Sequence, residues 1–207
     1  MTEMVDIDDF LPLVLRYAPN TNDLVAYQNL IEAAREMSER LKNWRVTDEF
    51  PIDGPLVQGL CTIRDADIES IEEAWLNGIH LDPATPAWLD NNLAGWDTAE
   101  VTSSARYVTQ LTRNTVTVAP RANGDLRIRL ILKPALDALS LPRFFLTDYG
   151  TEIGMGAAGR ILTLPTSENP QLGLGHLSQF ADRLDTLAVR AAKGQQKAPL
   201  RTRGRYL

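Results

Sequence analysis

The spacing of apolar residues predicts two helices at the start of the chain. The first runs to Tyr17, with Asp8 or Asp9 positioned to cap its first turn. The second spans residues 22–43, where apolar side chains recur every three or four positions and charged side chains occupy the opposite face. That period is typical of a helix that buries one side against a core.

Between residues 45 and 134 the pattern changes to short alternating runs, interrupted by proline, glycine and asparagine. Two such runs flank Asn77-Gly78, a dipeptide that readily adopts the two positive φ angles of a tight hairpin turn. A second hairpin is predicted across residues 115–133, where Asn123-Gly124 separates the runs. Short strands divided by turn residues indicate an antiparallel β-sandwich or folded sheet.

In the last third of the chain the helical period returns and predicts two more helices. The expected fold class is therefore α+β. Residues 1–44 and 142–193 are expected to form a helical bundle built from both chain ends, with residues 45–141 as an inserted β domain. Residues 194–207 lack periodicity and are rich in Gly, Gln, Lys, Pro and Arg, so we expect a flexible, extended basic arm.

The two halves of the chain differ more in charge than in hydropathy. Residues 1–100 hold 20 acidic and six basic residues, whereas residues 101–207 hold seven acidic and 15 basic ones, within a net charge of −6. Five of the basic residues stand from Lys193 onward, with no acidic residue among them. Such asymmetry indicates interaction with a charged partner through an arm, and it also permits head-to-tail binding between copies. The overall acidity argues against a nucleic-acid-binding body, although the arm alone can contact phosphates.

The composition offers little material for catalysis, so we expect no enzyme, no cofactor and no metal. The chain has two histidines, His80 and His176, and one cysteine, Cys61, which excludes a disulfide within the chain. No nucleophile elbow, P-loop or zinc-protease motif occurs. Acidic residues near the N-terminus, and the lack of an apolar run of about 18 residues, predict neither a secretory leader nor a membrane span.

Three acidic residues alternate along one predicted strand, and we interpret them as a solvated face in preference to a magnesium site: Asp65, Asp67 and Glu69.

Residues 154–159 match the spacing of a dinucleotide-binding loop, but the surrounding pattern favours helix packing. A dinucleotide site requires a strand, a tight turn and a free helix start, whereas the residues before 154 already show a helical period. Small residues at steps of about four let another backbone approach closely, at a cost of about 1 kcal/mol for each glycine relative to alanine. We interpret the set as a helix-packing face or a subunit contact: Gly150, Gly154, Gly156 and Gly159.

The arm carries the most specific chemistry in the sequence. Its arginines alternate with other residues, so an extended backbone presents their guanidinium groups on one side, where they suit carboxylates or phosphates. Three interpretations stay open: a solvated tail, a contact with DNA, and docking into an acidic groove of a partner protein. The candidate binding residues are Lys197, Arg201, Arg203, Arg205, Tyr206 and Leu207.

Several stretches of the chain together form a pattern that is found in a known family: residues 10–19, residues 33–40 with Trp44, residues 141–142, 149–153, 156–162 and 169–172, and the arginine-rich terminus. These stretches resemble the head-to-tail adaptors of tailed bacteriophages, with a fold like that of the tail tubular protein A group. The resemblance covers the helical parts, about half of the chain, and in the β part only the order of elements is similar.

The resemblance implies a virion structural protein of the neck, or connector, without catalytic residues. Such an adaptor forms a dodecameric ring below the portal protein, joins the capsid to the tail tube, and continues the channel for genome ejection. Its C-terminal arm reaches the portal and its β part faces a tail nozzle or another tail protein. We expect assembly in the host cytoplasm, no membrane partner, and genomic DNA passing a channel that the acidic half of the chain lines. The alternative is a DNA-binding or DNA-packaging accessory protein that uses the same arm.

Overall fold

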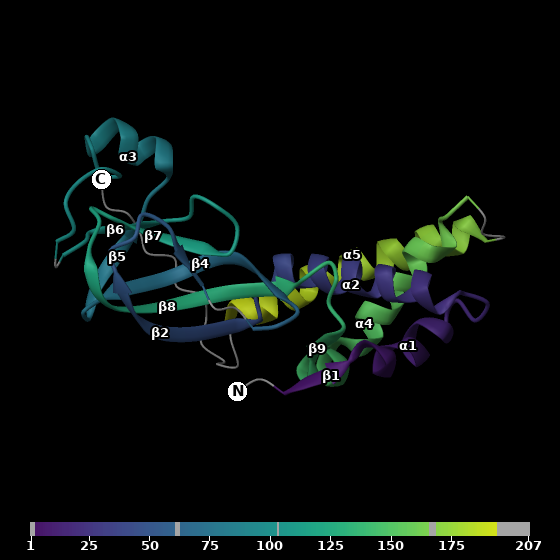
Figure 1. Ribbon diagram of the computed structural model, residues 1–207. Coiled ribbons are helices and arrows are strands. Elements are labelled where there is room, and N and C mark those ends of the chain that lie inside the picture. The colour runs from purple at the N-terminus through teal and green to yellow at the C-terminus, as the bar shows by residue number, and fades with distance from the viewer. Residues whose placement is uncertain (1–2, 61–62, 103, 166–168, 194–207) are drawn as a thin grey trace. The chain divides into compact units, whose positions relative to one another are not determined.

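The computed structural model of the 207-residue chain describes residues 3–60, 63–102, 104–165 and 169–193 (Figure 1). In these residues the chain has five α-helices and a nearly closed seven-stranded mixed sheet, so the protein belongs to the α+β class. The chain divides into two compact units: residues up to Asn43 join those from Pro134 onward, and Trp44–Lys133 form the other. The second crossing between the units therefore lies at Pro134, earlier than residue 141.

The first unit, called here the helical unit, holds four α-helices and a two-stranded sheet. Helix α4 contacts the three other α-helices of the unit, and Figure 1 shows them side by side. The second predicted helix is confirmed, because residues such as Ala26, Leu30 and Met37 recur at helical spacing and are buried. Asn22 caps this helix, and Lys42 ends it in a left-handed conformation. The elements are β1 (Met4–Asp6), the 3-10 helix η1 (Ile7–Phe10), α1 (Leu11–Leu15), α2 (Asp23–Leu41), β9 (Ser140–Pro142), α4 (Arg143–Leu162) and α5 (Pro170–Lys193).

The first helix differs from its prediction. Asp6, and neither Asp8 nor Asp9, caps the segment, because its extended backbone lets its carboxylate accept a hydrogen bond from the N–H of Asp8 at 3.0 Å. The chain then forms the short turn η1 before α1 begins at Leu11. Pro12 lies in the first turn of α1, where its missing N–H leaves no helical hydrogen bond unmade.

The second unit, called here the β unit, is one curved sheet, so of the two predicted alternatives the sandwich is wrong, and the sheet that forms is mixed and not purely antiparallel. A sandwich needs two separate sheets facing each other. Here β5 pairs antiparallel with β4 and parallel with β6, so the hydrogen bonding continues around a single core in the order β2-β8-β4-β5-β6-β7-β3. The elements are β2 (Arg45–Asp53), β3 (Gln58–Gly59), β4 (Ala66–Leu76), β5 (Ile79–Pro83), α3 (Pro86–Asn92), β6 (Tyr107–Thr109), β7 (Thr115–Ala119) and β8 (Asn123–Pro134).

One of the two predicted hairpins forms and the other does not. Asn77 and Gly78 turn between β4 and β5 with φ angles of 51° and 80°, as predicted. The prediction of a hairpin across residues 115–133 is wrong, because β7 pairs with β6 and β3 whereas β8 pairs with β2. Gly124 lies inside the β2–β8 ladder at a φ of 143°, and a Cβ there would lie 2.4 Å from the Asn77 side chain. The second Asn-Gly pair thus makes room for the first turn and forms no turn of its own.

Candidate functional site

Two of the four predicted glycines bring α4 against α1. Gly150 and Gly154 are buried and face Leu13. A Cβ on Gly154 would lie 2.8 Å from the carbonyl oxygen of Leu13, so the backbone of α1 occupies the space that a side chain would need. Because Gly154 lies deep inside a helix that begins at Arg143, it presents no free helix start for a dinucleotide.

The two other glycines bring α4 against α5. Gly156 faces the ring of Phe180, and Gly159 faces Leu177, with 3.0 Å between each added Cβ and its neighbour. Gly173 of α5 completes the contact, since a Cβ there would lie 2.9 Å from the carbonyl oxygen of Gly159. All four glycines of α4 are buried in the helical unit, so the small-residue face packs helices of the same chain.

Arg160 ties α4 to two neighbouring helices through charge. Its Nη2 donates a hydrogen bond to Oε2 of Glu36 on α2, and its Nε lies 3.7 Å from Oε2 of Glu32. Its guanidinium carbon lies 5.8 Å from the centre of the Phe180 ring on α5. The Arg160 side chain is only 21% exposed, so its charge is held in place with little screening by water.

A hollow of about 510 Å³ opens at one end of the helical unit, where α1 leads to α2 and where α4 ends. Its lining is largely uncharged and mixes apolar side chains with small polar ones. Two of its leucines, Leu164 and Leu172, are exposed even though they are apolar. The apolar lining residues include Tyr17, Pro19, Val25, Ile161, Leu164 and Leu172.

A fixed turn with two exposed leucines lies at the other end of α2. Arg35 donates a hydrogen bond from Nη1 to the carbonyl oxygen of Pro134, and the N–H of Ile7 donates to the carbonyl oxygen of Leu139 at 3.0 Å. Between these anchors Leu136 and Leu139 are 63% and 64% exposed. We call residues 134–139 the leucine turn. Its backbone is held by the helical unit, while its two exposed leucines are not covered by the residues of that unit that the structure describes.

Charges of the two sequence halves meet on the β unit. Nζ of Lys133 on β8 lies 2.6 Å from Oε2 of Glu69 on β4, and Nη1 of Arg129 lies 2.8 Å from Oε2 of Glu73. The guanidinium of Arg129 also lies over the ring of Trp75, 5.6 Å from its centre. Part of the charge asymmetry in the sequence is therefore neutralised by strand pairing.

The predicted acidic strand face is not formed. Asp67 is buried and accepts a hydrogen bond from Nη2 of Arg113, while Glu69 pairs with Lys133. Asp65 precedes β4 and has a left-handed φ of 65°. Among the described residues, no three His, Cys, Asp or Glu side chains gather in a way that could hold a metal ion.

A cluster of carboxylates surrounds Tyr27 in the helical unit. The Tyr27 hydroxyl donates a hydrogen bond to Asp8 of η1, and this bond is the main reason that the pKa of Tyr27 is raised to about 12. Desolvation and the negative charges of Asp8, Asp23 and Asp6 raise the pKa of Tyr27 further. The sequence reasoning missed this contact, because the two residues lie in different elements.

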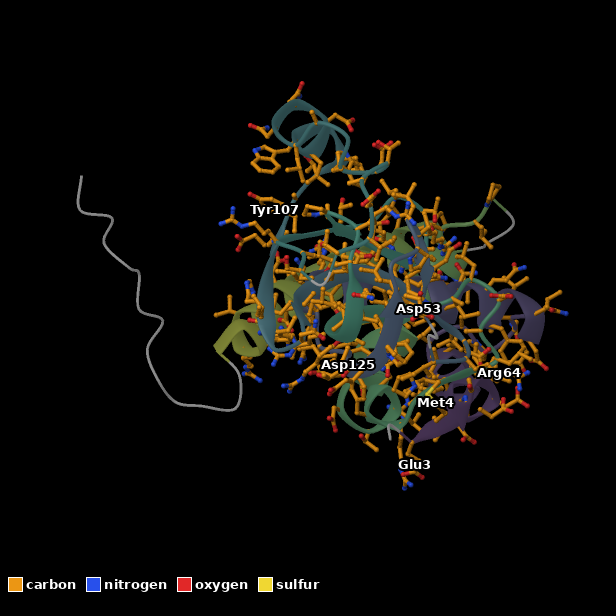
Figure 2. All side chains as sticks on the ribbon, turned by 60° about the vertical axis from the view of Figure 1, so that its left-hand side comes forward. Glu3, Met4, Asp53, Arg64, Tyr107 and Asp125 are labelled. Carbon is orange, nitrogen blue, oxygen red and sulfur yellow. The ribbon has the colours of Figure 1, made fainter. Side chains whose placement is uncertain are left out.

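The large aromatic residues of the β unit anchor its longest loop region. Trp96 is buried with Leu89, and its Nε1 donates a hydrogen bond to Oδ1 of Asp90 at 2.9 Å. Trp88 of α3 is partly exposed and lies against Tyr107, the residue labelled near α3 in Figure 2, with 4.9 Å between the ring centres.

The two histidines make no catalytic arrangement with the described residues. His80 is exposed, with Nδ1 3.7 Å from Oδ1 of Asp82, and His176 meets Tyr17 edge to face at 5.2 Å. Cys61 lies outside the described residues. The candidate arm residues also lie outside them: Lys197, Arg201, Arg203, Arg205, Tyr206 and Leu207.

None of the helices in the described residues combines the length and the apolar character that a bilayer crossing requires. A scan of the sequence against protein-family models and a search of the curated proteins find no match.

Proposed function

We propose that this protein is a structural component of a tailed-bacteriophage virion, a head-to-tail adaptor. In this proposal copies of the chain form a dodecameric ring below the portal protein, join the capsid to the tail, and continue the DNA channel. The partners are the portal protein, neighbouring adaptor subunits and a tail nozzle or other tail protein. The role is architectural and requires neither a catalytic residue nor a cofactor.

The observation that carries the proposal is where the matching stretches fall. Residues 10–19 and 33–40 lie in and around the first helices, residues 141–142 end β9, residues 149–153 and 156–162 lie in α4, and residues 169–172 lead into α5. Although separated by the β unit in sequence, they belong to one helical unit and touch directly, since Leu13 contacts Gly150 and Gly154. The stretches that resemble an adaptor therefore pack together as one folded unit. This supports a common origin of that unit and the corresponding unit of the adaptors.

Charge gives a second line of support. Residues 1–193 hold 27 acidic and 17 basic residues, so the body before the arm carries a net charge of −10, while residues 194–207 carry four basic residues and no acid. A basic arm and an acidic body suit contacts between unlike surfaces, as a ring and its portal require. An acidic channel wall also lets a DNA duplex pass without adhering to it.

The test compares the full chain with a chain that lacks residues 195–207, each mixed with portal rings of the same virus. We expect the full chain to decorate the rings with matching symmetry in electron micrographs. The truncated chain should keep its circular dichroism spectrum and lose binding, because the arginine-bearing segment is gone. A full chain that ignores portal rings would overturn the proposal, and unchanged binding after truncation would overturn the role of the arm.

Variants within the arm separate charge from apolar anchoring. Changing Arg201, Arg203 and Arg205 to alanine should weaken portal binding in a salt-dependent way, whereas Tyr206→Ala should weaken it at every salt concentration. If the arm instead binds duplex DNA below micromolar concentration with steep salt dependence, the DNA-binding alternative is favoured.

A further inference from the structure

We propose that the leucine turn of one copy of this chain docks into the hollow of a second copy, as the head-to-tail contact between subunits. The inference rests on the proposed ring, for which it names the contacting residues. Both surfaces belong to the helical unit, and both expose apolar side chains that the described residues of the unit leave uncovered. Apolar surface that a fold does not bury commonly marks a site of association.

The two surfaces cannot meet within one copy. Val25 of α2 lines the hollow, whereas Arg35 of the same helix holds the leucine turn through Pro134. Ten residues of α-helix separate these positions by about 15 Å at a rise of about 1.5 Å per residue. Because α2 is a continuous helix with both features attached to it, the turn of a copy can enter only the hollow of another copy.

The chemistry of the two surfaces is complementary. Leu136 and Leu139 offer apolar side chains, and the hollow offers an apolar lining that includes Ile161 and Leu172. Because the carbonyl groups of the turn already accept hydrogen bonds from the Arg35 side chain and the Ile7 backbone, little conformational entropy is lost when it docks.

Charge fixes the direction in which the turn enters. Asp137 is exposed between the two leucines, and Arg16 is exposed next to the lining residue Tyr17. Neither Asp137 nor Arg16 forms an ion pair with a described residue of its own copy. Asp23 lies at the start of α2 beside the hollow, so attraction and repulsion together seat Asp137 on the Tyr17 side.

A contact between two unlike patches has a structural consequence. The first contact leaves one copy with a free hollow and the other with a free turn, so association continues until the chain of copies closes.

Two variants separate the halves of the contact. Leu136→Ser with Leu139→Ser removes the turn, and Leu172→Asp puts a charge in the hollow; all three side chains are exposed, so the fold should be kept. Val189→Ser, an exposed apolar position elsewhere on α5, is the matched control.

The mixing experiment uses sedimentation velocity on the full chain. Each half-variant alone should associate at least tenfold more weakly than the wild-type chain and the Val189→Ser control. An equimolar mixture of the two half-variants should form dimers and nothing larger, because only one turn and one hollow remain competent. Assembly of either half-variant to wild-type size would overturn the inference, as would a mixture that stays monomeric while the wild type assembles.

Weak association is captured by cross-linking in a Cys61→Ser background. A copy with Asp137→Cys and a copy with Arg16→Cys should be joined by a short bismaleimide, whereas Asp137→Cys with Val189→Cys should not be. Charge exchange, followed by sedimentation velocity, adds a check: Asp137→Arg and Arg16→Asp should each reduce association, and a mixture of the two should restore it. Absence of the cross-link would overturn this contact even if the chain binds portal rings, which keeps its failure distinct from that of the adaptor proposal.

Discussion

Gly154 of α4 and Gly175 of α5 both lie inside helices, but their surroundings differ. An added Cβ at Gly154 meets the backbone of Leu13, whereas an added Cβ at Gly175 meets nothing within 4 Å. Alanine gains about 1 kcal/mol of helix propensity over glycine at either position. At Gly154 this gain is exceeded by about 1–3 kcal/mol of overpacking, because a backbone cannot turn aside as a flexible side chain can.

We therefore expect Gly154→Ala to lower the free energy of unfolding by up to about 2 kcal/mol, the overpacking cost less the propensity gain, and Gly175→Ala to raise it by about 0.5–1 kcal/mol. Urea denaturation followed by circular dichroism measures both. Equal effects of the two substitutions would contradict the proposed distinction between a close backbone approach and an open position.

Tyr27 gives a prediction for alkaline pH. Its pKa is raised to about 12 in the folded protein, above the usual value near 10. A raised pKa means that the contact with Asp8 stabilises the fold fully below about pH 10 and that this stability is lost as the pH rises toward 12. Absorbance titration of tyrosinate should show the late-titrating group in the wild type and not in Tyr27→Phe. Asp8→Asn should lower the pKa of Tyr27, and an unchanged titration curve would rule the contact out.

At the scale of elements, α4 is the helix on which the helical unit depends. Arg160 connects it to α2 through Glu36 and to α5 through Phe180, with a side chain that is mostly buried. Arg40 also pairs with Glu36, but its other partner Asp185 is well exposed. The two arginines thus bind one carboxylate in different surroundings.

We expect Arg160→Ala to cost about 2–3 kcal/mol of unfolding free energy, because it leaves a half-buried carboxylate without its main partner. Arg40→Ala should cost less than about 1 kcal/mol, as exposed pairs do. Thermal or urea unfolding of both variants, and of each combined with Glu36→Gln, measures the coupling. A larger loss of unfolding free energy for Arg40→Ala than for Arg160→Ala would show that Arg40, and not Arg160, is the more important link between the helices.

The elements that the sequence predicted well are those whose signal is local. The period of α2 and its Asn22 cap lie within one segment, and so do the Asn77-Gly78 turn and the glycines of α4. The second hairpin failed because the partner of β8 is β2, about 80 residues away, and pairing over that separation leaves no local pattern.

The same reasoning explains what was missed at the candidate surfaces. Asp67 alternates like a solvated residue, yet Arg113 from a distant loop makes its burial possible. The hollow and the leucine turn are built from segments that lie far apart in the chain, so no continuous run of residues predicts them. Exposed leucines become informative only when the fold shows which of them the described residues of the same unit leave uncovered.

At the scale of the whole molecule, the β unit is an insertion whose two ends meet. The N–H of Leu132 donates a hydrogen bond to the carbonyl oxygen of Trp44 at 2.8 Å, and β2 and β8 run antiparallel from that point. The chain therefore leaves the helical unit and returns to it at neighbouring positions. An insertion with adjacent ends can be exchanged without stretching its host.

We expect a chain in which a short Gly/Ser linker replaces residues 44–133 to keep a folded helical unit. Circular dichroism should show helix content that melts cooperatively, and residues 44–133 alone should give a cooperatively unfolding β protein. The matched control is the same linker inserted between Asn43 and Trp44 of the intact chain, which should leave both units folded. A deletion variant that is soluble but melts without cooperativity would show that the helical unit depends on the insertion.

The neighbouring ends of the β unit also determine how a mechanical pull acts on its strands. A pull that separates the two units acts on Trp44 and Lys133 together and in the same direction, so it does not peel β2 from β8. The strand pair is joined to the rest of the sheet through β8 and β4, where Lys133–Glu69 and Arg129–Glu73 bridge the strands. Sliding of β8 along β4 is therefore the deformation that these two ion pairs oppose.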